Sequence, residues 1–222
     1  PNSTSYNNVI GEVVYDAIVD PIPSFSGEPD NTPYVCYADV SNLLFGLSDL
    51  EGTYTLANVT SSLGSNFSTG LAAGWTLVMI YENPNLNTKS FTVFDGFSHI
   101  YDSHTETIPI SGFNTPPSGS IDIQMAYAAL DGDRTKRATK MEIDGKSVTS
   151  GGSRANKYFG SVIENSDGVA HPRNPYSANT LGYDTGFLEI KNAEPEYVGN
   201  GDTTSGFTLQ VARGQADPIF TF

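Results

Sequence analysis

Short apolar segments, each closed by a turn-forming residue, recur along the whole chain and constrain its fold more than any other feature. They are rich in Val, Ile, Thr, Tyr and Phe, and Gly, Pro, Asn or Asp bounds almost every one. Helical periodicity is scarce. Such segments predict strands, which we expect at residues 9–19, 34–45, 53–59, 75–82, 90–95, 104–110, 120–130, 139–144, 158–163, 186–190 and 206–212.

The connections between these segments carry residues typical of tight turns. Examples are Asn83-Pro84-Asn85, Thr115-Pro116-Pro117-Ser118-Gly119 and Asp144-Gly145. Many short strands at this spacing are typical of a β-sandwich or jelly roll. We therefore expect an all-β fold, a sandwich or jelly roll of about ten to twelve antiparallel strands, with residues 1–222 forming one domain.

The densest apolar run is AGWTLVMIYENPN, at residues 73–85. Its apolar part is shorter than the roughly 20 residues that cross a bilayer, so it does not predict a membrane span. On an extended chain both of its faces are largely apolar, which is typical of a strand covered on both sides. We expect a central core strand at residues 75–82, ended by Pro84.

The charge of the chain is strongly negative and unevenly distributed. A net charge of −14 argues against binding to nucleic acid, where a basic face supplies the affinity. No Lys or Arg precedes Lys89, whereas seven occur between Arg134 and Lys157. This asymmetry predicts head-to-tail attraction between copies, or attraction between the two regions within one molecule. Acidity that serves only solubility is the third interpretation.

Motifs for catalysis are absent from the sequence. It contains no nucleophile elbow, no phosphate-binding loop and no dinucleotide fingerprint. We therefore expect no enzymatic activity and no cofactor, although bound calcium is possible. Only 16% of the residues are charged, and Ser, Thr, Asn and Gly must supply much of the polar surface. This composition favours an extracellular location, in which case the chain is a mature one whose leader has been removed.

Two short stretches could hold a metal ion. His99, Asp102 and His104 offer ligands suited to zinc or another transition metal, although a solvated polar loop would look the same. Asp131 and Asp133 flank Gly132, and alternate carboxylates can wrap calcium. The neighbouring Arg134 opposes a cation there.

Other residues bear on cross-linking and glycosylation. Cys36 is the only cysteine, so it is either a buried apolar thiol or a link between two chains. Asn2, Asn58 and Asn66 stand in N-x-[ST] sequons, which permit glycosylation without indicating it.

The two ends of the chain alternate like strands. Residues 1–20 and 215–222, the latter with Ile219, Phe220 and Phe222, could complete the open sheet edge of a neighbouring copy. Pairing within their own sheet is the alternative.

Several segments in order resemble bacterial and archaeal cell-surface β-sandwich domains of unknown function, which occur in adhesins and envelope proteins. The segments are YADVSNLL (37–44), GTYTLANV (52–59), AGWTLVMIYENPN (73–85), FTVFDGF (91–97), IPISGFNTPPSG (108–119), ALDGDR (129–134) and RNPYSANTLGYDTGFLEI (173–190). The resemblance implies a secreted, all-β, non-enzymatic module of a stalk, adhesin or surface coat. Members usually continue into further repeats, whereas this sequence closes with GQADPIFTF.

The sequence therefore predicts a non-enzymatic structural or adhesive protein of the cell surface that assembles with copies of itself into a coat, sheath or filament. The alternative is an adhesin module that binds surface glycans or calcium, for which the 12 tyrosines could provide aromatic platforms.

Overall fold

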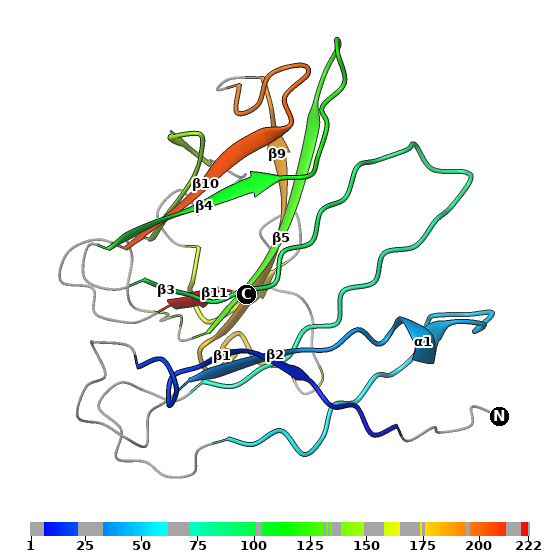
Figure 1. The fold of residues 1–222 in the computed structure, drawn as a ribbon, viewed down its shortest axis with the longest axis vertical. Coiled ribbons are helices and arrows are strands. Elements are labelled where there is room, and N and C mark those ends of the chain that lie inside the picture. The colour runs from blue at the N-terminus through cyan, green and yellow to red at the C-terminus, as the bar shows by residue number, and fades with distance from the viewer. Residues whose placement is uncertain are drawn as a thin grey trace. The chain divides into compact units, whose positions relative to one another are not determined.

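Strands dominate the structure, a computed structural model that describes residues 7–21, 33–61, 72–100, 104–130, 132, 134, 139–148, 158–164, 174, 176–193, 196–211 and 219–221. The elements in these residues are β1 (Glu12–Asp16), β2 (Tyr34–Tyr37), α1 (Ser41–Leu44), β3 (Ser98–Ile100), β4 (Thr105–Ser111), β5 (Asp122–Leu130), β6 (Thr139–Ile143), β7 (Lys146–Ser147), β8 (Ile163–Glu164), β9 (Tyr183–Lys191), β10 (Thr204–Val211) and β11 (Ile219–Thr221). The expected all-β class is confirmed (Figure 1).

The chain divides into two compact units. Unit 1 comprises Pro1–Ser65 and Asp95–Phe97, and unit 2 comprises Asn66–Phe94 and Ser98–Phe222. Unit 1 holds a two-stranded antiparallel sheet of β1 and β2, in which Glu12 lies opposite Tyr37. The rings of Tyr15 and Phe97 stack, with their centroids 3.6 Å apart. The expectation of a single domain stays a prediction.

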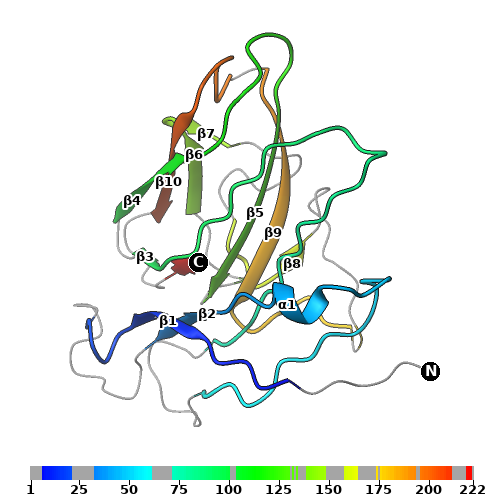
Figure 2. The same cartoon turned by 45° about the vertical axis from the view of Figure 1, so that its right-hand side comes forward.

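Unit 2 holds two larger sheets. One has the order β4-β10-β6-β7 and the other the order β3-β11-β5-β9-β8 (Figure 2). The longest ladder joins β5 to β9 and runs from Asp122 opposite Lys191 to Leu130 opposite Tyr183. The pairs of strands are antiparallel except β8 with β9, which is parallel and departs from the expected all-antiparallel arrangement.

Most of the buried apolar side chains of the two larger sheets belong to one cluster. Alternation in the sequence places one face of the longer strands there. Residues of the first sheet in this cluster are Met141, Ile143, Phe207 and Leu209, and those of the second are Ile100, Ala129, Leu188 and Ile190. Tyr158 and Phe159 join the cluster from the segment that precedes β8.

The predicted turns lie where strands reverse. Asp144 and Gly145 both have positive φ, at 47° and 72°, as a two-residue hairpin between β6 and β7 requires. In the turn between β4 and β5, Thr115 Oγ1 donates a hydrogen bond to the Gly199 carbonyl at 2.7 Å. The Asn200 amide donates to the carbonyls of Pro116 and Gly119, so two turns that are far apart in sequence hold one end of unit 2 together.

Three predicted strands, 53–59, 75–82 and 90–95, are wrong, because none of these segments forms a strand in the structure; of the predicted strand 158–163, only Ile163 lies in a strand, β8. Hydrophobic patterning shows which side chains prefer to be buried, but a strand also needs a neighbouring backbone to bond with. The described chain supplies none to these segments. The expected strand 34–45 also ends early, because the Asp39 carboxylate accepts the N–H of Ser41 at 2.8 Å and the chain turns into α1.

Candidate functional site

The predicted histidine cluster is only partly assembled. His99 lies half-buried in β3, opposite Phe220 of β11, and Asp102 lies outside the described residues. His104 is exposed and its Nε2 lies 3.1 Å from Glu106 Oε2. Burial, and then the charge of His104, lower the pKa of His99 to about 4. Among the residues that the structure describes, no three His, Cys, Asp or Glu side chains are grouped to hold a metal ion.

The second predicted metal pair, Asp131 and Asp133, lies outside the described residues, but its neighbour Gly132 is described. Gly132 is buried against the carboxylate of Asp184, and a Cβ at this position would lie 1.8 Å from Asp184 Oδ2. Asp184 is fully buried, and its Oδ1 accepts the N–H groups of Gly160 and Val162 at 2.9 and 2.8 Å. This carboxylate fastens the segment before β8 to β9.

Sequence reasoning missed Asp184. Its segment, Tyr183-Asp184-Thr185-Gly186-Phe187, was expected to be a strand only from residue 186 onward. The signal available in the sequence was an acidic residue two positions before Gly186, whose lack of a side chain makes room for Tyr127 on the neighbouring strand. That signal does not identify which backbone groups the carboxylate binds.

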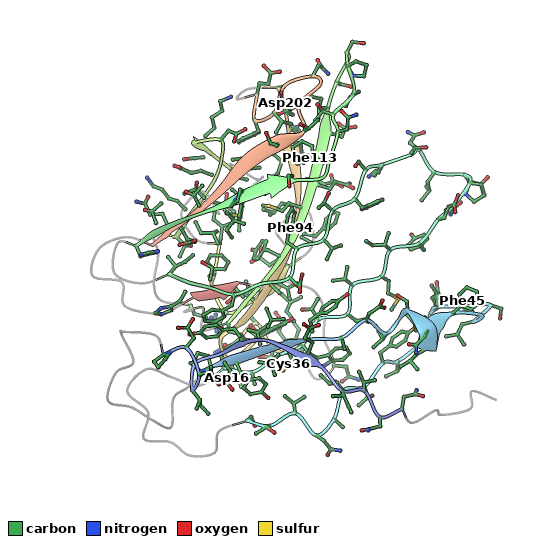
Figure 3. The ribbon with its side chains drawn as sticks, viewed as in Figure 1. Asp16, Cys36, Phe45, Phe94, Phe113 and Asp202 are labelled. Carbon is green, nitrogen blue, oxygen red and sulfur yellow. The ribbon has the colours of Figure 1, made fainter. Side chains whose placement is uncertain are left out.

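Cys36 is exposed on β2, opposite Val13 of β1. The interpretation of a buried thiol is therefore wrong, because alternation along a strand does not by itself bring another part of the chain over the thiol. An exposed thiol is accessible to a second chain, and the cross-link stays a prediction. Figure 3 shows Cys36 and Asp16 on the neighbouring strands of this sheet.

The carboxyl-terminal strand pairs within its own chain. Ile219 and Phe220 belong to β11, which lies between β3 and β5, and Phe222 lies outside the described residues. The tail thus pairs within its own sheet, which was the alternative to completing the sheet of a neighbouring copy. If the tail were exchanged between copies, it would have to make the same pairing with β3 and β5 of the other copy. Of the sequons, Asn58 is exposed with a positive φ of 61°, whereas Asn2 and Asn66 lie outside the described residues.

Residues 72–94 of unit 2 form a long segment without strands, which we name the apolar arm (Figures 1 and 2). It carries the apolar run that predicted a core strand. Val78 and Ile80 are 61% and 55% exposed, whereas Leu77 and Met79 are half-buried. The large apolar side chains that it exposes are Trp75, Val78, Ile80, Tyr81, Leu86, Phe91, Val93 and Phe94. Single exposed apolar residues are ordinary, but a contiguous set marks an interaction surface.

The arm is anchored at its root and at one point on its return. Tyr183 of β9 donates a hydrogen bond to the Trp75 carbonyl at 2.9 Å and bonds to the Thr76 hydroxyl. Gly74 packs against the Tyr183 ring so closely that a Cβ would lie 2.0 Å from it. On the return, Lys89 bonds to Gln124 of β5. Burial raises the pKa of Tyr183, which keeps its hydroxyl protonated as the donor.

Between these anchors the backbone of the arm is unpaired. Within the described part of the chain, residues 77–82 make no hydrogen bonds, and the bond from the Leu86 N–H to the Asn83 carbonyl only closes the turn at the tip. Unpaired N–H and C=O groups in an extended, β-prone segment form a template for pairing with another strand. The arm therefore offers both apolar side chains and open backbone groups.

Unit 1 also exposes most of its apolar side chains. Among its described residues Ala17 is the one buried apolar residue, whereas Ile10, Val13 and many others are exposed. Phe45, just after α1, is 92% exposed (Figure 3). A hollow of about 380 Å³ next to β1 is lined by apolar residues such as Val9 and Leu43 together with acidic ones. A two-stranded sheet without a covered face is marginal in water.

Comparison with family models, with characterised proteins and with solved structures finds no match to this chain. In the described residues, no helix is long and apolar enough to cross a membrane.

Proposed function

We propose that this chain is a non-enzymatic structural or adhesive protein of the extracellular cell surface that assembles with copies of itself. One observation carries the proposal. Of the large apolar side chains exposed in the described residues, all but Tyr176, Leu181 and Phe187 belong to unit 1 or to the apolar arm. Apolar surface concentrated in this way is stabilised when a partner covers it.

The low share of charged residues and the resemblance to surface domains support an extracellular setting for this assembly. We further propose that unit 2 is a β-sandwich. Its two larger sheets contribute their inward side chains to one apolar cluster, which is the arrangement of a sandwich core.

The assembly state of the purified chain tests the proposed function. We expect light scattering after size exclusion to give a mass well above that of one 23.8 kDa chain, and negative-stain images to show repeating particles, sheets or filaments. Light scattering should show the same mass with reductant present, because apolar contacts rather than Cys36 hold the copies together. A monomer at all concentrations, with and without calcium, would contradict the proposal.

An adhesin module that binds glycans is a second candidate, and one observation favours it. Trp75, which the sequence predicted to be buried, is 42% exposed, and Tyr81 and Tyr176 are also exposed. Exposed aromatic rings can stack on the apolar faces of sugars. A glycan array probed with the labelled chain tests this function: binding that is lost in Trp75→Ala would support it, and an array without hits would remove it.

A further inference from the structure

We infer that the apolar arm is the surface on which unit 1 of a second copy docks. This inference rests on the proposed function and adds where the copies meet. The arm comprises 23 residues, 72–94, and a stable interface takes about 20–30 residues from each partner. The arm is thus large enough to form most of one side of a specific interface.

The exposed apolar side chains of the two surfaces are complementary in kind. The arm presents Val78 and Ile80, and unit 1 presents Ile10 and Val13, all of them β-branched and exposed. β1 pairs with β2 along one edge, and its other edge has no partner strand among the described residues. An open strand edge can add to an unpaired extended segment through main-chain hydrogen bonds, while alternate side chains fill the contact.

The distribution of charge favours unit 1, rather than unit 2, of the second copy as the part that binds the arm. Unit 1 carries nine acidic residues and no Lys or Arg, whereas all 11 Lys and Arg residues of the chain belong to unit 2. A contact between two copies of unit 1 would bring together only like charges, which is destabilising. A contact between unit 1 and unit 2 is the arrangement that can give the carboxylates of unit 1 a cationic neighbour, and the arm supplies one, Lys89, together with one acidic residue, Glu82.

Such a contact is head to tail. Each copy uses unit 1 to dock on the arm of one copy and its own arm to receive unit 1 of another copy. If two copies exchange these contacts about a two-fold axis, a closed dimer results. Heterologous contacts of this kind produce rings or open filaments. The proposed assembly therefore follows from one repeated contact.

The first test compares the effect on assembly of substitutions in the arm with the effect of the same substitutions at exposed apolar positions elsewhere. The variant Val78→Asp with Ile80→Asp places two carboxylates where the acidic unit 1 would dock. The matched control, Tyr176→Asp with Leu181→Asp, makes the same change in charge at two other exposed residues of unit 2. We expect the arm variant to be monomeric in light scattering and the control to assemble like the wild type.

A milder pair, Val78→Thr with Ile80→Thr, keeps the β-branched shape and adds no charge. We expect it to weaken assembly about tenfold or more in concentration, with unchanged circular dichroism. If both arm variants assemble as the wild type does, the arm is not the interface, and the inference is overturned while the proposed function stands. A monomeric wild type would overturn both.

The second test identifies the occupant. The variant Ile10→Asp with Val13→Asp alters the docking surface of unit 1 and leaves the arm intact. We expect this variant and the arm variant to be monomeric when separate and to form a one-to-one dimer when mixed, because each retains the surface that the other lacks. Absence of a dimer in the mixture would overturn the inference. A wild-type monomer with the arm protected from hydrogen exchange would mean that the chain's own unit 1 covers it, and would also overturn it.

Discussion

Asp184 shows how much one side chain can contribute to this fold. A carboxylate removed from water is stabilising only when it is hydrogen-bonded, and here it accepts two backbone N–H groups from the segment before β8. The side chain therefore links the edge strand β8 to the long ladder of β5 and β9.

Replacement of Asp184 by Ala should lower the free energy of unfolding by about 2–4 kcal/mol, because two buried N–H groups lose their acceptor. Urea unfolding followed by fluorescence measures this loss. Glu189→Ala is the control on the same strand, since Glu189 is exposed, and should change the stability by about 0.5 kcal/mol or less. An Asp184→Ala protein with the wild-type midpoint would show that the carboxylate has no structural role.

His99 makes stability depend on pH. Its pKa is lowered from 6.5 to about 4 in the folded chain, so the unfolded chain takes up a proton more readily. Above about pH 6.5 His99 is neutral in both states and costs no stability. As the pH falls from 6.5 toward 4 the unfolded chain is protonated first, so the free energy of unfolding decreases. Because the ring retains some exposure to solvent, we expect a loss of roughly 1–2 kcal/mol.

Urea midpoints measured across this pH range check the prediction for His99. The His99→Gln variant removes the titrating group, so its stability should decline less steeply than that of the wild type below pH 6.5. The carboxylates titrate in both proteins and cancel in the comparison. Equal slopes in the two proteins would refute the assignment.

The apolar arm shows why patterning alone misjudged an element. The sequence marked residues 75–82 as apolar on both faces, and it correctly placed a turn at Asn83-Pro84-Asn85. The prediction of a core strand added an assumption, that the same chain supplies the neighbouring strands. Among the residues that the structure describes, hydrogen bonds from unit 2 hold the arm at Tyr183, at the root, and at Gln124, on the return.

The link between Tyr183 and the arm can be tested by hydrogen exchange. Tyr183→Phe removes the donor to the Trp75 carbonyl and should speed amide exchange in residues 72–80 severalfold, because one hydrogen bond contributes about 1 kcal/mol. Tyr127→Phe is the control, since it removes a similar bond, to the Tyr158 carbonyl at 3.1 Å, and does not touch the arm. Equal exchange in residues 72–80 of both variants would contradict the proposed anchor.

The strands of unit 2 were predicted more accurately. The segments 104–110, 120–130, 139–144 and 206–212 correspond closely to β4, β5, β6 and β10. Their alternation matches the observed burial, because each packs one face on the apolar cluster and finds its partner within the chain. β3 and β7 were not predicted, since strands of two or three residues are too short to show a period.

In the whole molecule, buried apolar residues are unevenly distributed between the two units, and this sets how much each unit contributes to stability. Unit 2 contains the apolar cluster, and unit 1 buries little of what it could among its described residues. The described residues of unit 1 therefore bury too little apolar surface among themselves to contribute much to its stability. If a second copy provides further contacts, stability must depend on concentration.

We expect the melting temperature of the wild type to rise with protein concentration, because assembly binds the folded chain and not the unfolded one. The arm variant Val78→Asp with Ile80→Asp should melt at one temperature regardless of concentration. Scanning calorimetry over a wide range of concentrations measures both. A wild-type melting temperature that does not change with concentration would count against a partner that completes unit 1.

The sequence alone determined the all-β class, the main strands and turns of unit 2, and the uneven charge of the two parts of the chain. These are local properties, set by side-chain periodicity, turn residues and composition. Only the tertiary structure decided that Asp184 is buried, that Cys36 is exposed and that the most apolar segment is uncovered. Burial depends on which distant backbone comes to lie beside a residue, and that is a property of the folded chain and of its partners.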